Sequence, residues 1–219
     1  LSMYIISIYF SINFLKKNTV KSAIYASLFS ALLIDLRILG IIIPIIVFIF
    51  YFVNFFETNK KINNLLPIVI FGLLMPILII IFWPYLWESP LENFIFAFNR
   101  LSNFDEYIFN FYFGEHIFSQ DIPWHYPVVW IGITTPLLYT ILFFIGVFFI
   151  LKKFFFRLNQ IEKNPKGKFW MNDNEMKDLV FLSSFLIPLI MVILLNSSLY
   201  DGWRHLYFIY PSFLLISVY

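Results

Sequence analysis

Long runs of apolar residues alternate along this chain with short polar segments. Four runs carry no charged residue and approach the roughly 20 residues that a helix needs to cross a bilayer: residues 38–56, 65–87, 127–151 and 179–195. Three shorter runs cover residues 1–15, 20–34 and 206–219, and we interpret the first and last as truncated spans. The pattern predicts an all-α fold, a polytopic transmembrane helical bundle of about seven membrane segments.

Small residues recur in the run at residues 20–34, where Ala23, Ser27 and Ala31 follow one another at four-residue spacing. Such a stripe lets membrane helices approach closely, so it predicts a segment packed inside the bundle. Prolines within the runs are tolerable because neighbouring helices satisfy the freed carbonyls; they are Pro44, Pro76, Pro136 and Pro188.

The composition agrees with lipid as the main solvent. Hydrophobic residues make up 61% and charged residues 13% of the 219 residues, and the mean hydropathy is +0.82. A net charge of +2 is no basic footprint, so we expect no nucleic-acid partner. The absence of cysteine excludes disulfides, thiolate metal sites and cysteine nucleophiles.

Both ends of the chain fall inside apolar runs, at Leu1 and at Tyr219. No charged n-region with a small-residue cleavage site marks a signal peptide. We therefore interpret residues 1–219 as a single transmembrane domain that is a fragment of a longer protein.

Basic residues divide unevenly between alternate loops. Twelve of the fifteen fall on one side, which the positive-inside rule makes cytoplasmic, and only Arg37, Arg100 and Arg204 fall on the other. The second side also receives the three histidines and eight of the thirteen acidic residues. This bias predicts a multi-pass protein of the cell (inner) membrane whose chemistry lies on the outer, periplasmic or extracellular face. The segment 152–178 is predicted to be a basic cytoplasmic loop.

The largest predicted outer loop, residues 88–126, is too long to be a plain connector. Ser89, Pro90 and Glu92 form a capping box, and the apolar residues that follow recur at helical spacing. The pattern predicts an amphipathic helix on the membrane surface. Such a helix either shields the bundle or walls a lateral entrance for a lipid-borne substrate.

The last outer segment places Arg204 and His205 beside a span and against the positive-inside bias. Charges there are costly without partners, and these two donors suit a phosphate, which arginine binds bidentately. Gly202 permits a close backbone approach. Asp35 and Arg37 form a second cluster on the same face, and both clusters could converge on one anionic headgroup. A simple surface ion pair is the alternative for the second cluster.

The three histidines and the nearby acids match no metal-ligand spacing, so no metal site is predicted. No glycine-rich phosphate loop is present either, and no cofactor is expected.

Three segments carry a resemblance to a known family: Trp83–Pro84–Tyr85–Leu86–Trp87–Glu88–Ser89–Pro90, Ile122–Pro123–Trp124–His125–Tyr126–Pro127 and Tyr200–Asp201–Gly202–Trp203–Arg204–His205. In their order and shared outer placement they resemble superfamily C glycosyltransferases. The nearest group is the protein O-mannosyltransferase-like branch (glycosyltransferase family 39), which includes bacterial aminoarabinose transferases. The similarity extends from about Ile24 to the C-terminus.

The resemblance implies a membrane enzyme that takes a sugar from a polyprenyl- or dolichyl-phosphate carrier and passes it to an acceptor protein or glycolipid. The general base of such enzymes usually lies in the first outer loop, so we expect it upstream of Leu1. The implied carrier-phosphate ligands are Arg204, His205 and Arg37, supported by Asp201, Gly202 and Asp35. The implied sugar-cavity residues are Trp124, His125, Tyr126 and Glu88.

Two other classes stay open. A lipid-linked saccharide flippase or transporter would require charged residues near the midplane or broken helices in inverted repeats, and the four long runs show neither. A structural membrane subunit would leave the outer arginine and histidine unexplained.

Overall fold

The computed structural model describes residues 1–57, 65–102, 108–163 and 168–219. Within these ranges the chain forms nine α-helices and one two-stranded hairpin, with 78% helix and 4% strand. The helical prediction is confirmed, and the hairpin is an addition that the apolar pattern did not predict. Some of the charged residues counted above by their side of the membrane lie outside the described ranges or have no described side chain: Lys60, Lys61, Lys163, Lys166, Asp105 and Glu106.

The N-terminal half forms α1 (Ser2–Lys17), α2 (Val20–Leu36), α3 (Ile42–Glu57), α4 (Leu66–Phe82) and α5 (Pro90–Ser102). The C-terminal half forms β1 (Phe109–Tyr112), β2 (Glu115–Phe118), α6 (Tyr126–Thr134), α7 (Leu137–Lys163), α8 (Asp173–Leu194) and α9 (Tyr210–Ser217). Short 3-10 helices are η1 (Ile38–Ile41), η3 (Pro84–Leu86) and η4 (Arg204–Ile209).

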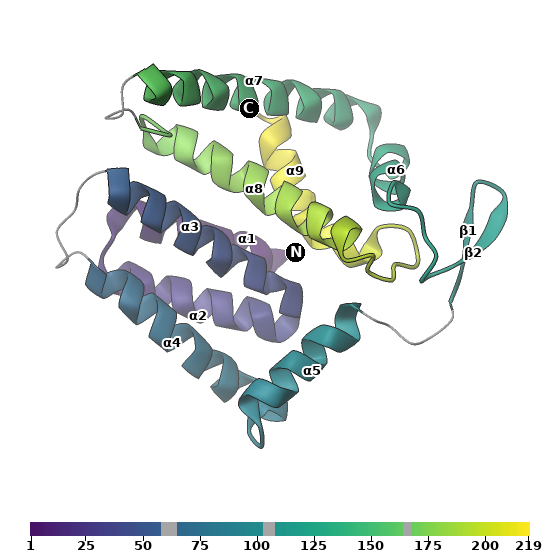
Figure 1. Cartoon of the computed structure of the whole chain (residues 1–219), viewed down its shortest axis with the longest axis horizontal. Helices are drawn as coiled ribbons and strands as arrows, with labels where there is room; N and C mark the ends of the chain where they lie inside the picture. Colours follow the sequence, from purple (N-terminus) through teal and green to yellow (C-terminus); the bar gives the residue numbers. More distant parts are fainter. Residues whose placement is uncertain (58–64, 103–107, 164–167) are drawn as a thin grey trace.

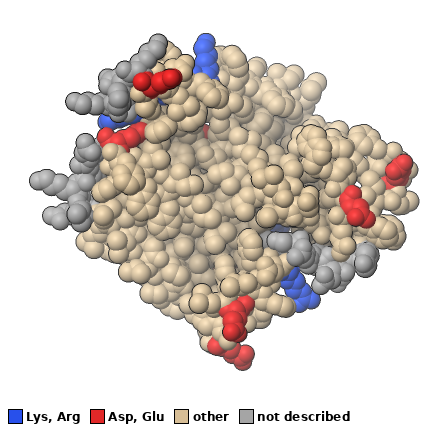
Figure 2. Space-filling model, in the orientation of Figure 1, with Lys and Arg blue, Asp and Glu red and all other residues tan. Residues whose placement is uncertain are grey.

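The long helices run roughly lengthwise between two ends of the molecule (Figure 1). The hairpin, α5 and α6 lie at one end, here called the hairpin end. The C-terminal ends of α1, α3 and α7 lie at the other, here called the lysine end because Lys16 and Lys17 end α1 there. Most charged side chains on the face shown in Figure 2 lie near its rim, and its centre is largely uncharged.

Three of the described helices are long and apolar enough to cross a membrane. They are Ile38–Glu57, which combines η1 with α3, Leu137–Glu162 and Asp173–Leu194, whereas the apolar α4 has 17 residues. These helices indicate a membrane protein, and the total of about seven segments stays a prediction.

The segment expected as one span at residues 127–151 is divided into α6 and α7. Thr135 is extended (φ −90°, ψ 135°), as expected for a residue that precedes a proline, and Pro136 has no N–H to continue α6. At its other end α7 continues to Lys163. The predicted loop 152–178 is therefore wrong over residues 152–163, which belong to α7, and over residues 173–178, which belong to α8.

Small and hydroxyl side chains bring α1, α2 and α4 together. Ala23, Ser27 and Ala31 are fully buried, which confirms the prediction that this stripe packs inside the bundle. Ser27 Oγ lies 2.8 Å from the Ala23 carbonyl oxygen and 3.4 Å from that of Phe71 in α4. The hydroxyl therefore stays bonded within its own helix while the two helices approach closely.

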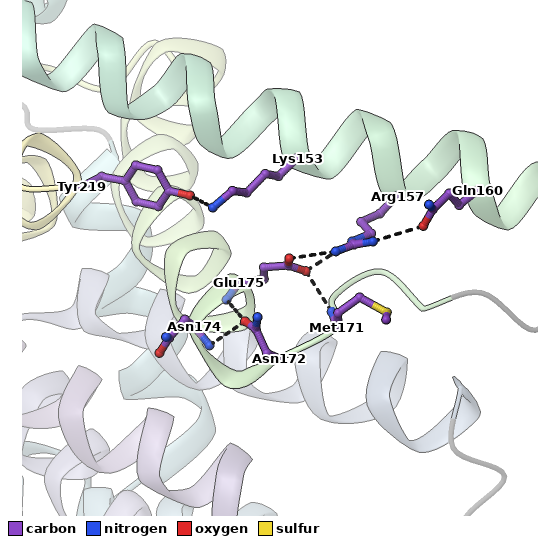
Figure 3. A network of polar contacts seen from close by, with 8 residues as sticks. All are labelled: Lys153, Arg157, Gln160, Met171, Asn172, Asn174, Glu175 and Tyr219. Atoms are coloured by element: carbon purple, nitrogen blue, oxygen red, sulfur yellow. Dashed lines mark hydrogen bonds and ion pairs between the residues drawn. The ribbon is translucent and has the colours of Figure 1, made fainter.

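Polar contacts join α7 and α8 at the lysine end (Figure 3). Arg157 of α7 donates to both carboxylate oxygens of Glu175, at 3.0 and 3.4 Å, and Glu175 also accepts from the Met171 N–H at 2.8 Å. Asn172 caps α8 by accepting from the N–H groups of Asn174 and Glu175. These contacts join α7 to the first turn of α8.

A close approach joins α7 to α9. A Cβ on Gly146 would overlap the Ile216 carbonyl oxygen, whereas a Cβ on Gly132 in α6 would meet nothing within 4 Å. We expect Gly146→Ala to force the helices apart at a cost of about 1–3 kcal/mol, and Gly132→Ala to be neutral or stabilising. Thermal unfolding in detergent should show a midpoint lowered by several degrees for the first variant alone. Equal midpoints would contradict the described α7–α9 contact.

Candidate functional site

Arg37 follows the last turn of α2 and connects the two halves of the chain at the hairpin end. Its Nη1 donates to the His205 carbonyl oxygen at 2.6 Å, and its guanidinium lies 5.8 Å from the centre of the Phe208 ring. Arg37 therefore contacts η4, as the predicted convergence of the two clusters requires. Among the described residues it forms no ion pair with Asp35, so the simple surface-pair alternative is wrong.

Arg204 and His205 follow a tight turn at the N-terminal end of η4. Arg204 Nη1 lies 3.4 Å from Asp201 Oδ2, and both side chains are largely exposed. Such a pair is weak, so the guanidinium is available to a ligand. His205 is half-buried and packs edge-on against Tyr200, with ring centres 4.3 Å apart. Its Nε2 is buried without a hydrogen-bond partner in the described part of the chain.

Two open cavities share Arg37 in their lining. The first, here called the aromatic cavity, has a volume of about 750 Å³ and also includes Asp201 and Arg204. Its aromatic lining consists of Tyr4, Phe109, Phe111, Tyr126, Trp130, Trp203, Tyr207 and Phe208. The second, here called the apolar cavity, has a volume of about 620 Å³ and includes Asp35 and His205.

Helix α5 forms one wall of the apolar cavity. Phe96, Ala97 and Phe98 line it from α5, opposite Met191 and Leu195 of the α8 end. The predicted surface helix is therefore present, and it does more than cover the bundle. Leu91 and Ile95 on the same helix are 79% and 58% exposed, which suits a helix lying in a membrane interface.

The predicted site residues fall into two groups. All six predicted phosphate-site residues line at least one of the two cavities: Arg37, Arg204, His205, Asp35, Asp201 and Gly202. Of the predicted sugar residues only Tyr126 does so. Trp124 is 69% exposed, Glu88 is exposed, and His125 packs against Tyr112 of the hairpin, all three outside both cavities.

Asp35 lies partly buried in the last turn of α2. Its carboxylate has no hydrogen-bond or ion-pair partner among the residues that the structure describes. The helix dipole disfavours a negative charge at the C-terminal end of a helix, so the dipole of α2 does not stabilise the Asp35 carboxylate. Within the described ranges no group of three or more potential metal ligands is found.

Asn110, Trp130 and Thr134 belong to the site and were missed from the sequence. They come from the hairpin and from α6, which the pattern assigned to a loop and to a long span. In the structure the residues from Phe109 to Tyr112 alternate between exposed and buried, as expected for a strand. The sequence does not show this alternation, because the exposed residues are phenylalanines and the buried ones are an asparagine and a tyrosine.

A scan against family models and searches of curated proteins and of solved structures found no match to this chain. The site therefore has to be interpreted from its own chemistry.

Burial is the main reason why the pKa of His205 lies below its usual range, and the charges of Arg37 and Arg204 lower it further. In the unfolded chain the pKa of a histidine is about 6.5, so His205 binds a proton more weakly in the folded state than in the unfolded state. Protonation of His205 therefore opposes folding. The contribution to stability is present above about pH 6.5 and is lost as the pH falls through the unfolded value toward the lowered one.

We predict that NMR of histidine-labelled protein gives His205 a midpoint below about 6.5, assigned by loss of the signal in His205→Gln. Arg37→Gln should raise this midpoint without restoring the ordinary value, because burial persists. A wild-type midpoint at or above the ordinary value would contradict the described environment.

Proposed function

We propose that this chain is part of an integral membrane glycosyltransferase that takes a sugar from a polyprenyl- or dolichyl-phosphate carrier. The acceptor is a protein or a glycolipid on the periplasmic or lumenal side. The observation that supports this best is that Arg37 lines both cavities. Arg204 also lines the aromatic cavity, and α5 lines the apolar cavity.

The aromatic cavity suits the glycosyl phosphate. Two guanidinium groups in one partly enclosed site favour a phosphate, which arginine binds in a bidentate manner. A volume of about 750 Å³ lies in the range of small-ligand pockets, and aromatic faces with a few polar groups are their usual lining.

The apolar cavity suits the first isoprene units of the carrier. Residues of α5 and of the end of α8 line it. Because α5 is the amphipathic helix expected at the membrane surface, the cavity would be accessible to a lipid-borne chain. An isoprenoid chain buried there would lose contact with water, which favours binding by the hydrophobic effect.

In the proposed reaction the bond between the sugar C1 and the carrier phosphate oxygen breaks while a bond forms from the acceptor oxygen or nitrogen to C1. The electron pair of the broken bond stays on the phosphate, where Arg37 and Arg204 stabilise the added charge. A carboxylate base takes the acceptor proton. No nucleotide is required, because the lipid phosphate is the leaving group.

The charge distribution supports an outward orientation of the hairpin end. Lys16 and Lys17 end α1 and Lys21 lies in the first turn of α2, at the lysine end, where the positive-inside rule expects the cytoplasm. The division of residues 127–151 into α6 and α7 is a broken helix of the kind that a transporter would contain, which the four apolar runs did not predict. A transporter is nevertheless supported less well, because in the described ranges the buried polar side chains are serines, one threonine and one asparagine, with no charged residue.

The test is binding of undecaprenyl phosphate to the full-length protein in nanodiscs. Arg37→Gln and Arg204→Gln should each weaken binding about ten- to a hundredfold, the usual effect of losing one charged hydrogen bond. Arg204→Lys should recover only part of it, because a point charge replaces a bidentate donor.

Lys152→Gln, in α7 and outside both cavities, is the matched control and should bind as the wild type does. Uncharged undecaprenol should bind all four variants equally. Wild-type affinity of both arginine variants for undecaprenyl phosphate would refute the assignment of the phosphate site.

A further inference from the structure

The turn that precedes Arg204 has a backbone conformation that needs outside support. Asp201 (φ 55°) and Gly202 (φ 68°) are both left-handed. This conformation is unfavourable for a residue with a Cβ, so Asp201 adopts it only where its surroundings favour it. A Cβ on Gly202 would also lie 3.2 Å from the Trp130 ring.

Asn110 of the hairpin holds both sides of this turn. Its Nδ2 donates to the Leu199 carbonyl oxygen at 2.9 Å, and its Oδ1 accepts from the Asp201 N–H at 3.3 Å. The same Oδ1 accepts from the Tyr126 hydroxyl at 3.2 Å. Asn110 is 6% exposed, so these bonds are shielded from water.

Helix α6 completes the support with two side chains. The Tyr126 hydroxyl accepts from the Gly202 N–H at 3.1 Å, and Thr134 Oγ1 accepts from the Trp203 indole N–H at 2.8 Å. Thr134 in turn donates to the Trp130 carbonyl oxygen at 2.6 Å. Every residue from Asp201 to Trp203 is thus bonded to the hairpin or to α6, and Arg204, which follows directly, keeps an exposed side chain in the cavity wall.

We propose that Asn110 and Tyr126 are positioning residues: through the 199–203 turn they fix the direction of the Arg204 guanidinium toward the aromatic cavity. The inference rests on the proposed function, since it assumes that Arg204 binds the carrier phosphate. It assigns the hairpin and α6 a role in substrate recognition, and it predicts that phosphate affinity depends on the hydrogen bonds that hold the turn as well as on Arg204 itself. Both residues also line the aromatic cavity, and Thr134→Val tests the same support through a bond to Trp203.

A matched pair of tyrosines tests the proposal. Tyr126→Phe removes the hydroxyl that holds Gly202, whereas Tyr112→Phe removes a neighbouring buried hydroxyl without a hydrogen-bond partner among the described residues. Tyr126→Phe loses the bonds of the hydroxyl to both Gly202 and Asn110. In the full-length protein in nanodiscs it should bind undecaprenyl phosphate about three- to tenfold more weakly, since only part of the energy of these bonds is transmitted to the phosphate. Tyr112→Phe should bind as the wild type does, and undecaprenol should bind both variants equally.

A second pair serves if Tyr126→Phe does not fold. Thr134→Val removes the bond to Trp203, whereas Thr135→Val removes a hydroxyl that is unpaired in the described structure. The proposal expects weaker binding of undecaprenyl phosphate only for Thr134→Val.

Three outcomes would overturn the proposal. The first is wild-type affinity of Tyr126→Phe and Thr134→Val for undecaprenyl phosphate while Arg204→Gln binds weakly, which leaves the proposed function intact. The second is equal weakening for undecaprenyl phosphate and undecaprenol, which indicates a merely structural role. The third is wild-type affinity of Arg204→Gln, which refutes the proposed function as well.

Discussion

The hydrogen bond from Arg37 to the His205 carbonyl oxygen is the contact on which the described site depends. It joins the end of α2 to the first turn of η4, across 168 positions of sequence, and Arg37 lines both cavities. A charged side chain at the boundary of an apolar bundle is costly unless it is paired. Arg37 meets this requirement with one carbonyl and one aromatic face, which leaves further donors for a ligand.

Much of the helical architecture could be predicted from the apolar runs, because a bilayer requires long continuous stretches. The stripe of Ala23, Ser27 and Ala31 also predicted a buried helix correctly, since close packing in lipid selects small residues. The division at Pro136 could not be predicted with the same certainty. Membrane helices often accommodate proline, and only the extended Thr135 shows that this one does not.

The site was predictable where it depends on charge and less so where it depends on shape. Arg37, Arg204 and His205 stood out because they violate the positive-inside bias, and they do lie together. Trp124 and His125 were expected in the sugar cavity because the resemblance of residues 122–127 implied it, and they lie outside both cavities. Asn110 gave no signal at all, because its role arises from contacts with residues 89 and 91 positions further on.

The most direct measurement is a cryo-electron microscopy map of the full-length protein in nanodiscs with undecaprenyl phosphate. The account predicts phosphate density within hydrogen-bond distance of Arg37 and Arg204, with the isoprenoid chain leaving along α5. Density for the phosphate at the lysine end, with none between these two arginines, would contradict it.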